Sequence, residues 1–199
     1  MPRAATHRTA IIGAAAKLFR RQGYAATGLA EILKLSGAPR GSFYHYFPGG
    51  KIDVAVAVAE TAGPAVRATI AKLADEDASA ADLVRRFARQ LADWLEKSGY
   101  AEGCPIATLM LELADKEPAV AQAGAASLQT WAEEIAARLV SEGLPEDRAA
   151  RLARFAIAAL EGGMVLTRVE RSRAALEEAG EEAAAAIEAA FISAEIRAR

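Results

Sequence analysis

The segment over residues 27–47 constrains the fold of this chain more than any other part of its sequence. Its first half places apolar residues on one face of a short helix, at i, i+3 and i+4: Leu29, Ile32 and Leu33. Gly37 then permits a chain reversal, because glycine takes the left-handed conformation that ends a helix. Pro39 suits the start of a second helix, where no backbone N–H is needed. Two short helices joined by a glycine turn predict a helix-turn-helix, whose second helix enters the DNA major groove.

Positive charge is concentrated in the same part of the chain. Residues 1–51 carry eight Lys or Arg and one acidic residue, Glu31, which gives a net charge of +7, whereas the remainder has a net charge of −9. A solvated basic face would explain a basic N-terminus alone, but here the excess coincides with the helix-turn-helix. We therefore interpret it as a surface that binds DNA phosphates.

Around this motif the chain resembles the tetracycline-repressor (TetR) family of bacterial regulators. The family's N-terminal pattern is matched as a set by Phe19, Gly23-Tyr24, Thr27, Gly37, Gly41-Ser42-Phe43-Tyr44-His45-Tyr46-Phe47 and Lys51. Two positions depart from it. Pro39 replaces the usual Ser or Thr, and Pro48-Gly49-Gly50 makes the connection to Lys51 one residue longer. With Gly103-Cys104-Pro105-Ile106, these features resemble the branch that includes lincomycin-resistance repressors.

The residues that we expect at the DNA are Thr27, Pro39, Arg40, Gly41, Ser42, Tyr44, His45, Tyr46 and Lys51. Arg40 opens the second helix, where a guanidinium can bond a guanine through two hydrogen bonds, and Tyr44 shares its helix face. Thr27 and Lys51 begin two other helices, where the helix dipole favours contact with a phosphate. For Tyr46 the alternative is packing against a neighbouring helix.

The remainder of the sequence predicts an all-α protein. Hydrophobic residues make up 53% of the chain, and alanine is abundant. Apolar spacing and Gly or Pro stops predict about nine helices. The first covers about residues 6–22, two lie within 27–47, the fourth covers 51–73 with an interruption at 63–64, and five more begin near residues 79, 106, 118, 145 and 173. We expect Phe43 and Phe47 to pack inward.

We expect two domains. An N-terminal three-helix helix-turn-helix domain would bind DNA over residues 1–50, and a C-terminal helical domain would bind ligand and dimerise over residues 51–199.

The last two predicted helices are rich in small residues: Ala156, Ala158, Ala159, Gly162, Gly163, Ala183–Ala186, Ala189 and Ala190. A glycine inside a helix costs about 1 kcal/mol relative to alanine, so the Gly162-Gly163 pair should permit close approach of another helix. The resemblance implies a homodimer in which these two helices from each subunit form a four-helix bundle. The alternative is an alanine-rich packing surface within one subunit.

A second group of residues is a candidate lining for a small-molecule pocket: Trp94, Cys104, Met110, Trp131, Phe155 and Met164. Aromatic and Met residues at helical spacing are usually plain core. The resemblance implies that the same helices surround a pocket, and such a lining would suit an apolar or amphipathic effector. The acids Glu112, Asp115 and Glu161 are candidates for anchoring a cationic ligand, although acids usually lie at the surface.

Together these features predict a ligand-responsive transcriptional regulator, a repressor that binds a palindromic DNA operator as a homodimer and is released by an inducer. One alternative is a helical interaction module without DNA binding. Another is a redox sensor built on Cys104, because a thiol at a helix N-terminus can have a lowered pKa.

Neither an enzyme nor a metal or cofactor site is expected. Both histidines lie in the basic N-terminal region, and the sequence has no nucleophile–base pairing, metal-ligand spacing or nucleotide fingerprint. The single cysteine excludes an internal disulfide. With neither a signal peptide nor an apolar run of about 20 residues in view, we expect a cytoplasmic protein with no membrane partner.

Overall fold

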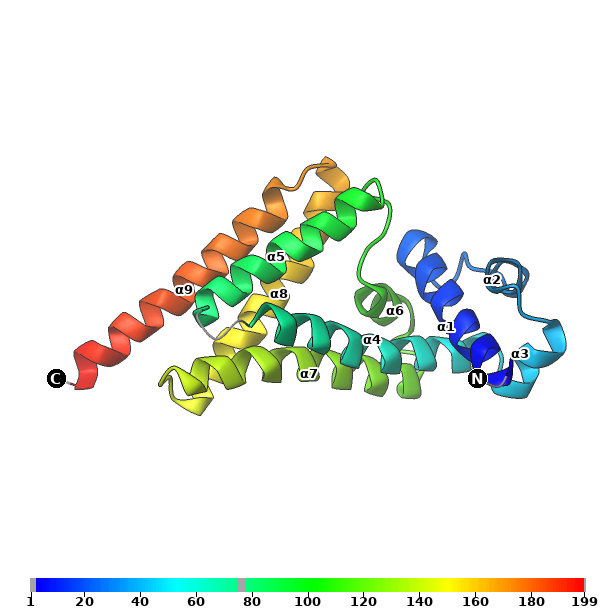
Figure 1. The fold of residues 1–199 in the computed structure, drawn as a ribbon, viewed down its shortest axis with the longest axis horizontal. Helices are drawn as coiled ribbons and strands as arrows, with labels where there is room; N and C mark the ends of the chain where they lie inside the picture. Colours follow the sequence, from blue (N-terminus) through cyan, green and yellow to red (C-terminus); the bar gives the residue numbers. More distant parts are fainter. Residues whose placement is uncertain (1–2, 75–77, 199) are drawn as a thin grey trace. The chain divides into compact units, whose positions relative to one another are not determined.

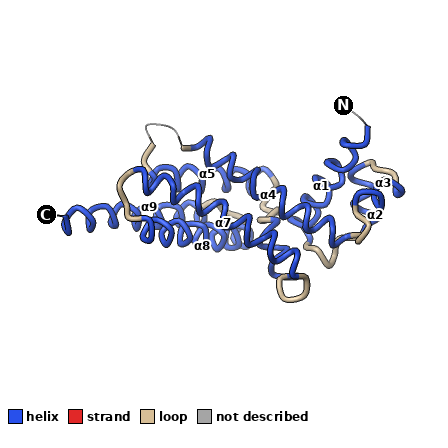
Figure 2. Tube along the Cα trace, turned by 90° about the horizontal axis from the view of Figure 1, so that it is seen from below, coloured by secondary structure: helices blue, strands red, loops and turns tan. Residues whose placement is uncertain are grey.

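The computed structural model describes residues 3–74 and 78–198. Within these ranges the chain forms nine helices and no strand (Figure 1, Figure 2). The helices are α1 Arg3–Gln22, α2 Leu29–Ser36, α3 Arg40–Tyr46, α4 Lys51–Leu73, α5 Ala80–Lys97, α6 Pro105–Leu113, α7 Pro118–Ser141, α8 Glu146–Glu170 and α9 Ala174–Ala198. The prediction of an all-α fold is confirmed.

Helix ends follow the local signals in the sequence. Gly37 has a φ of 65° and ends α2, with its N–H donating to the Leu33 carbonyl. The Ser79 hydroxyl caps α5 by accepting from the Asp82 N–H at 3.0 Å. One expectation was wrong, because α4 runs without a break through Pro64.

The chain divides into two compact units. Unit 1 contains residues 1–63 and 102–127, and unit 2 contains residues 64–101 and 128–199. Helices α4 and α7 contribute residues to both units. The division differs from the predicted boundary after residue 50, because unit 1 also holds the first half of α4 and all of α6.

The core of unit 1 is built around the helix-turn-helix. Phe19, Phe43 and Phe47 are almost completely buried, and the rings of Phe43 and Phe47 lie 5.6 Å apart. Burying each such side chain contributes about 1.5–3 kcal/mol. The inward packing of Phe43 and Phe47 is therefore as predicted. It leaves the other face of α3 outside the core.

By length and composition alone, one helix in the described ranges, α4, is apolar enough to cross a membrane. No apolar run of that length was expected from the sequence. Within unit 1, however, its residues Val54, Ala55 and Val58 are buried, as in the core helix of a globular domain. The Ser127 hydroxyl on α7 also donates to the Ala59 carbonyl at 2.7 Å.

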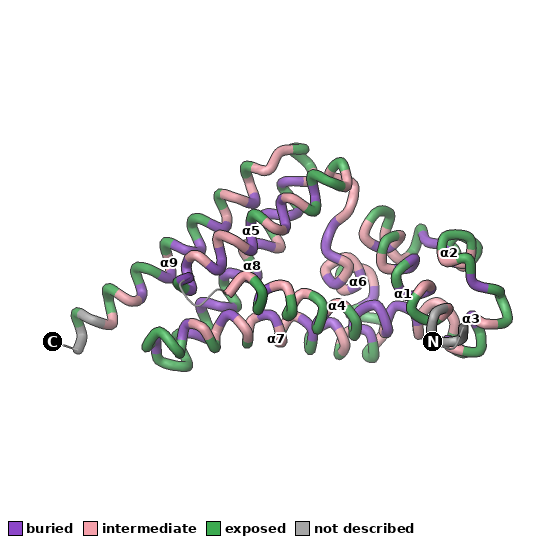
Figure 3. The backbone as a smooth tube through the Cα atoms, in the orientation of Figure 1, coloured by how far each residue is buried: buried purple, intermediate pink, exposed green. Residues whose placement is uncertain are grey.

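Unit 2 is organised by α5, α8 and α9, which pack against one another (Figure 1). Buried positions recur along each of the three helices (Figure 3). Two glycines allow the close approach. A Cβ on Gly180 would overlap with the Cβ of Ala88 on α5, and one on Gly163 would lie 3.1 Å from the Leu176 Cα. Gly163 therefore packs within the subunit, whereas Gly162 has no such neighbour and is exposed.

The Gly180 contact predicts a reversal of ordinary helix propensity. Gly180→Ala should lower the free energy of unfolding by about 1–3 kcal/mol, because the new methyl group must displace α5. Gly13→Ala in α1 is the matched control, since nothing lies near its Cβ direction. The control should raise the free energy of unfolding by about 0.5–1 kcal/mol. Chemical denaturation of both variants measures the difference, and stabilisation by Gly180→Ala would contradict the packing described.

Candidate nucleic-acid interface

The residues predicted to read DNA lie mainly on the outer face of α3. Five of the seven expected residues in this helix or just before it are exposed, and the other two, Ser42 and Tyr46, are half-buried. The exposed five are Pro39, Arg40, Gly41, Tyr44 and His45. Phe43 anchors the helix from behind and meets the Tyr44 ring edge-on at 5.4 Å. The Arg40 and Tyr44 side chains, one turn apart, therefore form an exposed polar surface on a helix that is fixed by its buried face.

The start of α3 has no capping side chain. Pro39 lies just before the helix in extended backbone, with φ −62° and ψ 145°, and Arg40 is the first helical residue. Proline has no side-chain oxygen, so the N–H groups of the first turn have no side-chain acceptor from it. Because the hydroxyl that is usual at this position is absent, no side chain caps the N-terminus of α3.

Thr27 has an internal role. Its side chain is 1% exposed, and its hydroxyl donates to the Gly23 carbonyl at 2.6 Å. At the start of α2 the Gly28 N–H donates to the Glu31 carboxylate at 2.9 Å. The hydroxyl that we expected at a phosphate therefore stabilises the turn between α1 and α2.

Lys51 also has partners within unit 1. Its Nζ donates to the carbonyls of Tyr24 at 2.8 Å and Thr27 at 2.9 Å, and it lies 4.0 Å from the centre of the Tyr24 ring. Burial lowers the pKa of Lys51, and the negative charge of Glu112 opposes that shift. The lysine thus joins α4 to the α1–α2 turn. The phosphate contact predicted for it would have to compete with these bonds.

Helix α6 and the loop before it also bond to the same turn and to the end of α1. The Glu112 carboxylate accepts from the N–H groups of Tyr24 and Ala25, each at 2.7 Å. The carboxylate of Glu102 pairs with Arg20, and the Gly103 N–H donates to the Arg20 carbonyl at 3.0 Å. Glu112 was a candidate anchor for a cationic ligand, but its oxygens accept hydrogen bonds from the backbone of the α1–α2 turn.

Besides Arg8, whose guanidinium lies 5.8 Å from the centre of the Phe47 ring, four basic side chains of unit 1 are exposed and form no ion pair with the described residues: Lys17, Arg21, Lys34 and Arg40. Arg40 belongs to the residues that we expected at the DNA, whereas the first three contributed only to the net charge of +7. Their spacing carries no motif, and only the folded unit shows which cations are already bonded. They are the better candidates for phosphate contacts than Thr27 and Lys51.

The six candidate pocket residues have different environments. Cys104 and Met110 belong to unit 1, and the other four belong to unit 2. Cys104, Trp131 and Met164 are buried, and Met110 is half-buried. The Cys104 sulfur accepts from the Ala107 N–H at 3.4 Å and so caps α6.

The expectation of an inward side chain was wrong at two of these positions. Trp94 is 40% exposed and Phe155 is 50% exposed. The buried face of α5 is centred on Leu91 and Leu95, with Trp94 at its edge, and Phe155 lies on the outer face of α8.

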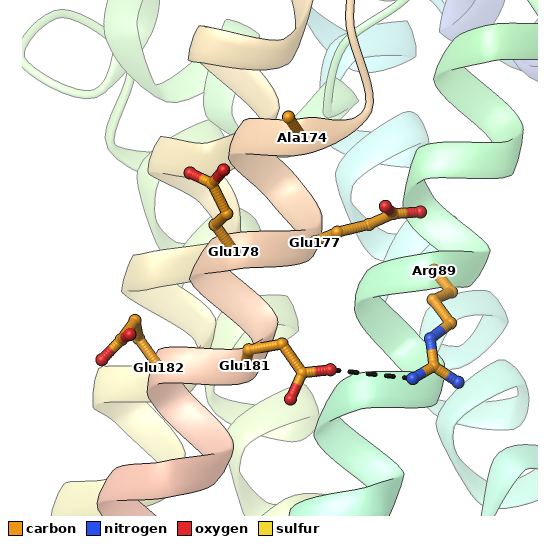
Figure 4. Close-up of a pocket in the computed structure, with 6 residues that line it drawn as sticks. All are labelled: Arg89, Ala174, Glu177, Glu178, Glu181 and Glu182. Carbon is orange, nitrogen blue, oxygen red and sulfur yellow. Dashed lines mark ion pairs between the residues drawn. The ribbon is translucent and has the colours of Figure 1, made fainter.

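A surface groove of about 470 Å³ lies on unit 2, lined by Arg89, Ala174, Glu177, Glu178, Glu181 and Glu182 (Figure 4). None of the candidate pocket residues lines it, and its acidic character does not suit an apolar ligand. Among the residues described, no cluster of three or more His, Cys, Asp or Glu side chains could hold a metal ion.

Two protein-family models match the chain. Residues 11–58 match the model of "Bacterial regulatory proteins, tetR family", and residues 80–182 match that of "Transcriptional regulator LmrA/YxaF-like, C-terminal domain". The first match spans the helix-turn-helix, and the second spans most of unit 2 together with α6.

Similar proteins include regulators from several bacteria. An HTH-type transcriptional regulator of Mycobacterium tuberculosis is 35% identical over 85% of this chain and 88% of its own length. The HTH-type transcriptional regulator LmrA of Bacillus subtilis is 32% identical over 80% of this chain and 85% of its own. A TetR transcriptional regulator from Chloroflexus aurantiacus has a related structure, with a TM-score of 0.77 and 28% identity over 94% of this chain and 97% of that one.

The Glu112 contacts predict a local effect on the α1–α2 turn. Glu112→Ala leaves the N–H groups of Tyr24 and Ala25 without their acceptor. It should lower the free energy of unfolding by about 1–3 kcal/mol and speed amide exchange at those two residues. Asp115→Ala is the control, because that exposed carboxylate has only a 3.9 Å pair with Lys116. Equal exchange in both variants, measured by NMR, would contradict the role given to Glu112.

Proposed function

The chain belongs to the TetR family of bacterial transcriptional regulators, with a LmrA/YxaF-like C-terminal domain, and we propose that it is a repressor of palindromic operators that a small-molecule inducer releases. Members of the family bind DNA and act as dimers. A homodimer would present two α3 helices to half-sites about 34–36 Å apart, or at multiples of that spacing. Acting on DNA within a bacterium, it would be cytoplasmic.

The observation that carries this proposal is the exposed face of α3. Arg40 stands at its start, where side chains of a recognition helix meet base edges, and Tyr44 stands one turn further on. Lys17, Arg21 and Lys34 supply unpaired positive charge in the same unit. The arrangement therefore combines a polar reading surface with cations that are free to meet phosphates.

Arg40 and Lys34 should affect DNA binding in different ways. Arg40→Ala should relax discrimination at one base pair, at a cost of about 1–3 kcal/mol for the preferred sequence. Lys34→Ala should weaken binding to every DNA sequence about equally. It should also reduce the slope of log affinity against log salt concentration by about 1. Fluorescence anisotropy with DNA from upstream of the gene, its point variants and a salt series measures both. Failure of the wild-type protein to bind that DNA at any salt concentration would overturn the proposal.

Lys51→Ala is a poor test of phosphate binding, because it also removes two hydrogen bonds to the α1–α2 turn. A loss of affinity in that variant could come either from a lost phosphate contact or from displacement of the recognition helix.

An exposed apolar face on unit 2 supports the homodimer. Large apolar side chains on the outside of the last two helices are Phe155, Val165, Leu166 and Val169 on α8, with Ile192 and Ile196 on α9. Large apolar side chains exposed on two neighbouring helices are typical of protein–protein interfaces. Because Gly163 is packed inside the subunit, enlarging it would test stability rather than association.

Leu166→Lys should convert the dimer to a monomer, because it would bury a charge in the interface. Val140→Lys on α7 is the matched control, since Val140 is also exposed but lies outside the α8–α9 face. Sedimentation velocity at several protein concentrations distinguishes them. A dimer of unchanged affinity in Leu166→Lys would mean that the interface lies elsewhere.

The effector part of the proposal is supported by the family and by the buried Trp131 and Met164 in unit 2. Nothing in the geometry favours a redox sensor instead, because the Cys104 sulfur is buried and caps α6. The exposed face of α3 likewise does not favour an interaction module without DNA binding.

A further inference from the structure

The outer face of α9 changes character along its length. Its exposed residues at helical spacing are Glu178, Glu182, Ala185, Ala189, Ile192 and Ile196. The N-terminal part of this face is acidic and the C-terminal part is apolar. These side chains lie on one side of the helix, since spacings of four, three and four residues keep a single face.

The outer face of α8 has the same organisation with the opposite charge. Its exposed residues are Arg148, Arg151, Phe155, Ala158, Gly162, Leu166 and Val169. Here the N-terminal part is basic and the C-terminal part is apolar. The two faces are therefore complementary in charge and alike in the order of their charged and apolar parts.

These charged side chains form almost no bonds within the subunit. Glu178, Glu182 and Arg148 form no side-chain bond with the described residues, and Arg151 has only an i,i+4 pair with Asp147 at 3.0 Å. Figure 4 shows that Glu178 and Glu182 point away from Arg89 on α5.

Their neighbours on α9 differ. Glu177 pairs with Arg173 at 2.9 Å, and Glu181 pairs with Arg85 at 2.7 Å. Among the acids of α9 that the structure describes, only the outward-facing Glu178 and Glu182 have no partner.

We propose that a second copy of the chain docks on this face in one register, with Arg148 and Arg151 of each protomer against Glu178 and Glu182 of the partner subunit. The inference rests on the proposed homodimer and adds its register and the contacts that select it. The acidic side of the groove in Figure 4 then binds the basic N-terminal end of α8 of the partner subunit.

The register follows from the direction of the helices. Helices α8 and α9 run antiparallel within a subunit, because three residues join them and Gly163 packs against Leu176 and Ala179. A two-fold axis perpendicular to the helices reverses direction, so α8 becomes parallel to the partner's α9. The basic end of α8 then lies at the same level along the bundle as the acidic end of that helix, diagonally across from it, and the two apolar ends are also level.

The lengths of the two patterns agree. Arg148 to Val169 spans about 31 Å and Glu178 to Ile196 about 27 Å at the rise of an α-helix. Both ends can therefore be in contact at once. With the two-fold axis along the helices, α8 would be antiparallel to the partner's α9, and arginines would face Ile192 and Ile196 across the interface. Charged groups buried against apolar ones disfavour that arrangement.

Charge reversal in two separate chains tests the register. The base-reversed variant carries Arg148→Glu and Arg151→Glu, and the acid-reversed variant carries Glu178→Arg and Glu182→Arg. Alone, each variant opposes like charges at both ends of its homodimer, so dimer affinity should fall by about tenfold or more. Mixed, the two variants restore opposite charges at both ends of a heterodimer.

Native mass spectrometry of a mixture in equal amounts gives the answer. The expected result is a heterodimer share well above the statistical one half, declining as salt is raised. Wild-type protein mixed with a mass-tagged copy provides the statistical control. Circular dichroism checks folding, and the single changes Arg151→Glu and Glu178→Arg repeat the test if a double variant does not fold.

The outcomes separate the two claims. A wild-type protein that remains monomeric overturns the proposed homodimer. A wild-type dimer whose reversed variants dimerise unchanged and mix statistically overturns the register but leaves the homodimer intact.

Discussion

The DNA-reading part of the molecule depends on how the turn between α1 and α2 is held. The Tyr24 N–H donates to the Glu112 carboxylate on α6, and its carbonyl accepts from the Lys51 ammonium on α4. Thr27 closes the turn internally through its hydroxyl. Two charged side chains thus bond the backbone of one turn from two other helices. The orientation of α2, and of α3 after it, follows from these contacts and from the buried Phe43 and Phe47.

This arrangement changes how the +7 charge of residues 1–51 should be understood. Lys51 and Arg20 are engaged with groups of unit 1, whereas Lys17, Arg21, Lys34 and Arg40 remain exposed. Each phosphate neutralised contributes a salt slope of about −0.9, so the dependence on salt should reflect the exposed cations rather than the net charge. Charge that seems uniform along the sequence is therefore divided between residues bonded within unit 1 and exposed residues, which we propose contact DNA.

Local signals were enough to predict most of the fold. The helices, the glycine turn at Gly37, the Ser79 cap and the inward Phe43 and Phe47 all depend on residues close in sequence. The role of Glu112 could not be predicted, because its hydrogen-bond partners lie 88 and 87 residues away and are backbone groups. The predictions for Trp94 and Phe155 were wrong for another reason. The spacing of apolar residues gives the approximate direction of the buried face of a helix but not where that face ends. Both residues lie outside the buried face of their helix.

The small residues of α8 and α9 had two interpretations, a dimer interface and a packing surface within one subunit. The two adjacent glycines of α8 show why neither was sufficient alone. Successive residues on a helix point about 100° apart, so neighbours can serve different surfaces. Gly163 faces α9 of its own subunit, and Gly162 lies on the exposed face. Small side chains such as Gly180 and Ala88 bring α5 and α9 together, which leaves the larger apolar and charged residues on the outside. Close packing within the subunit is thus what makes a patterned outer face available for a second copy.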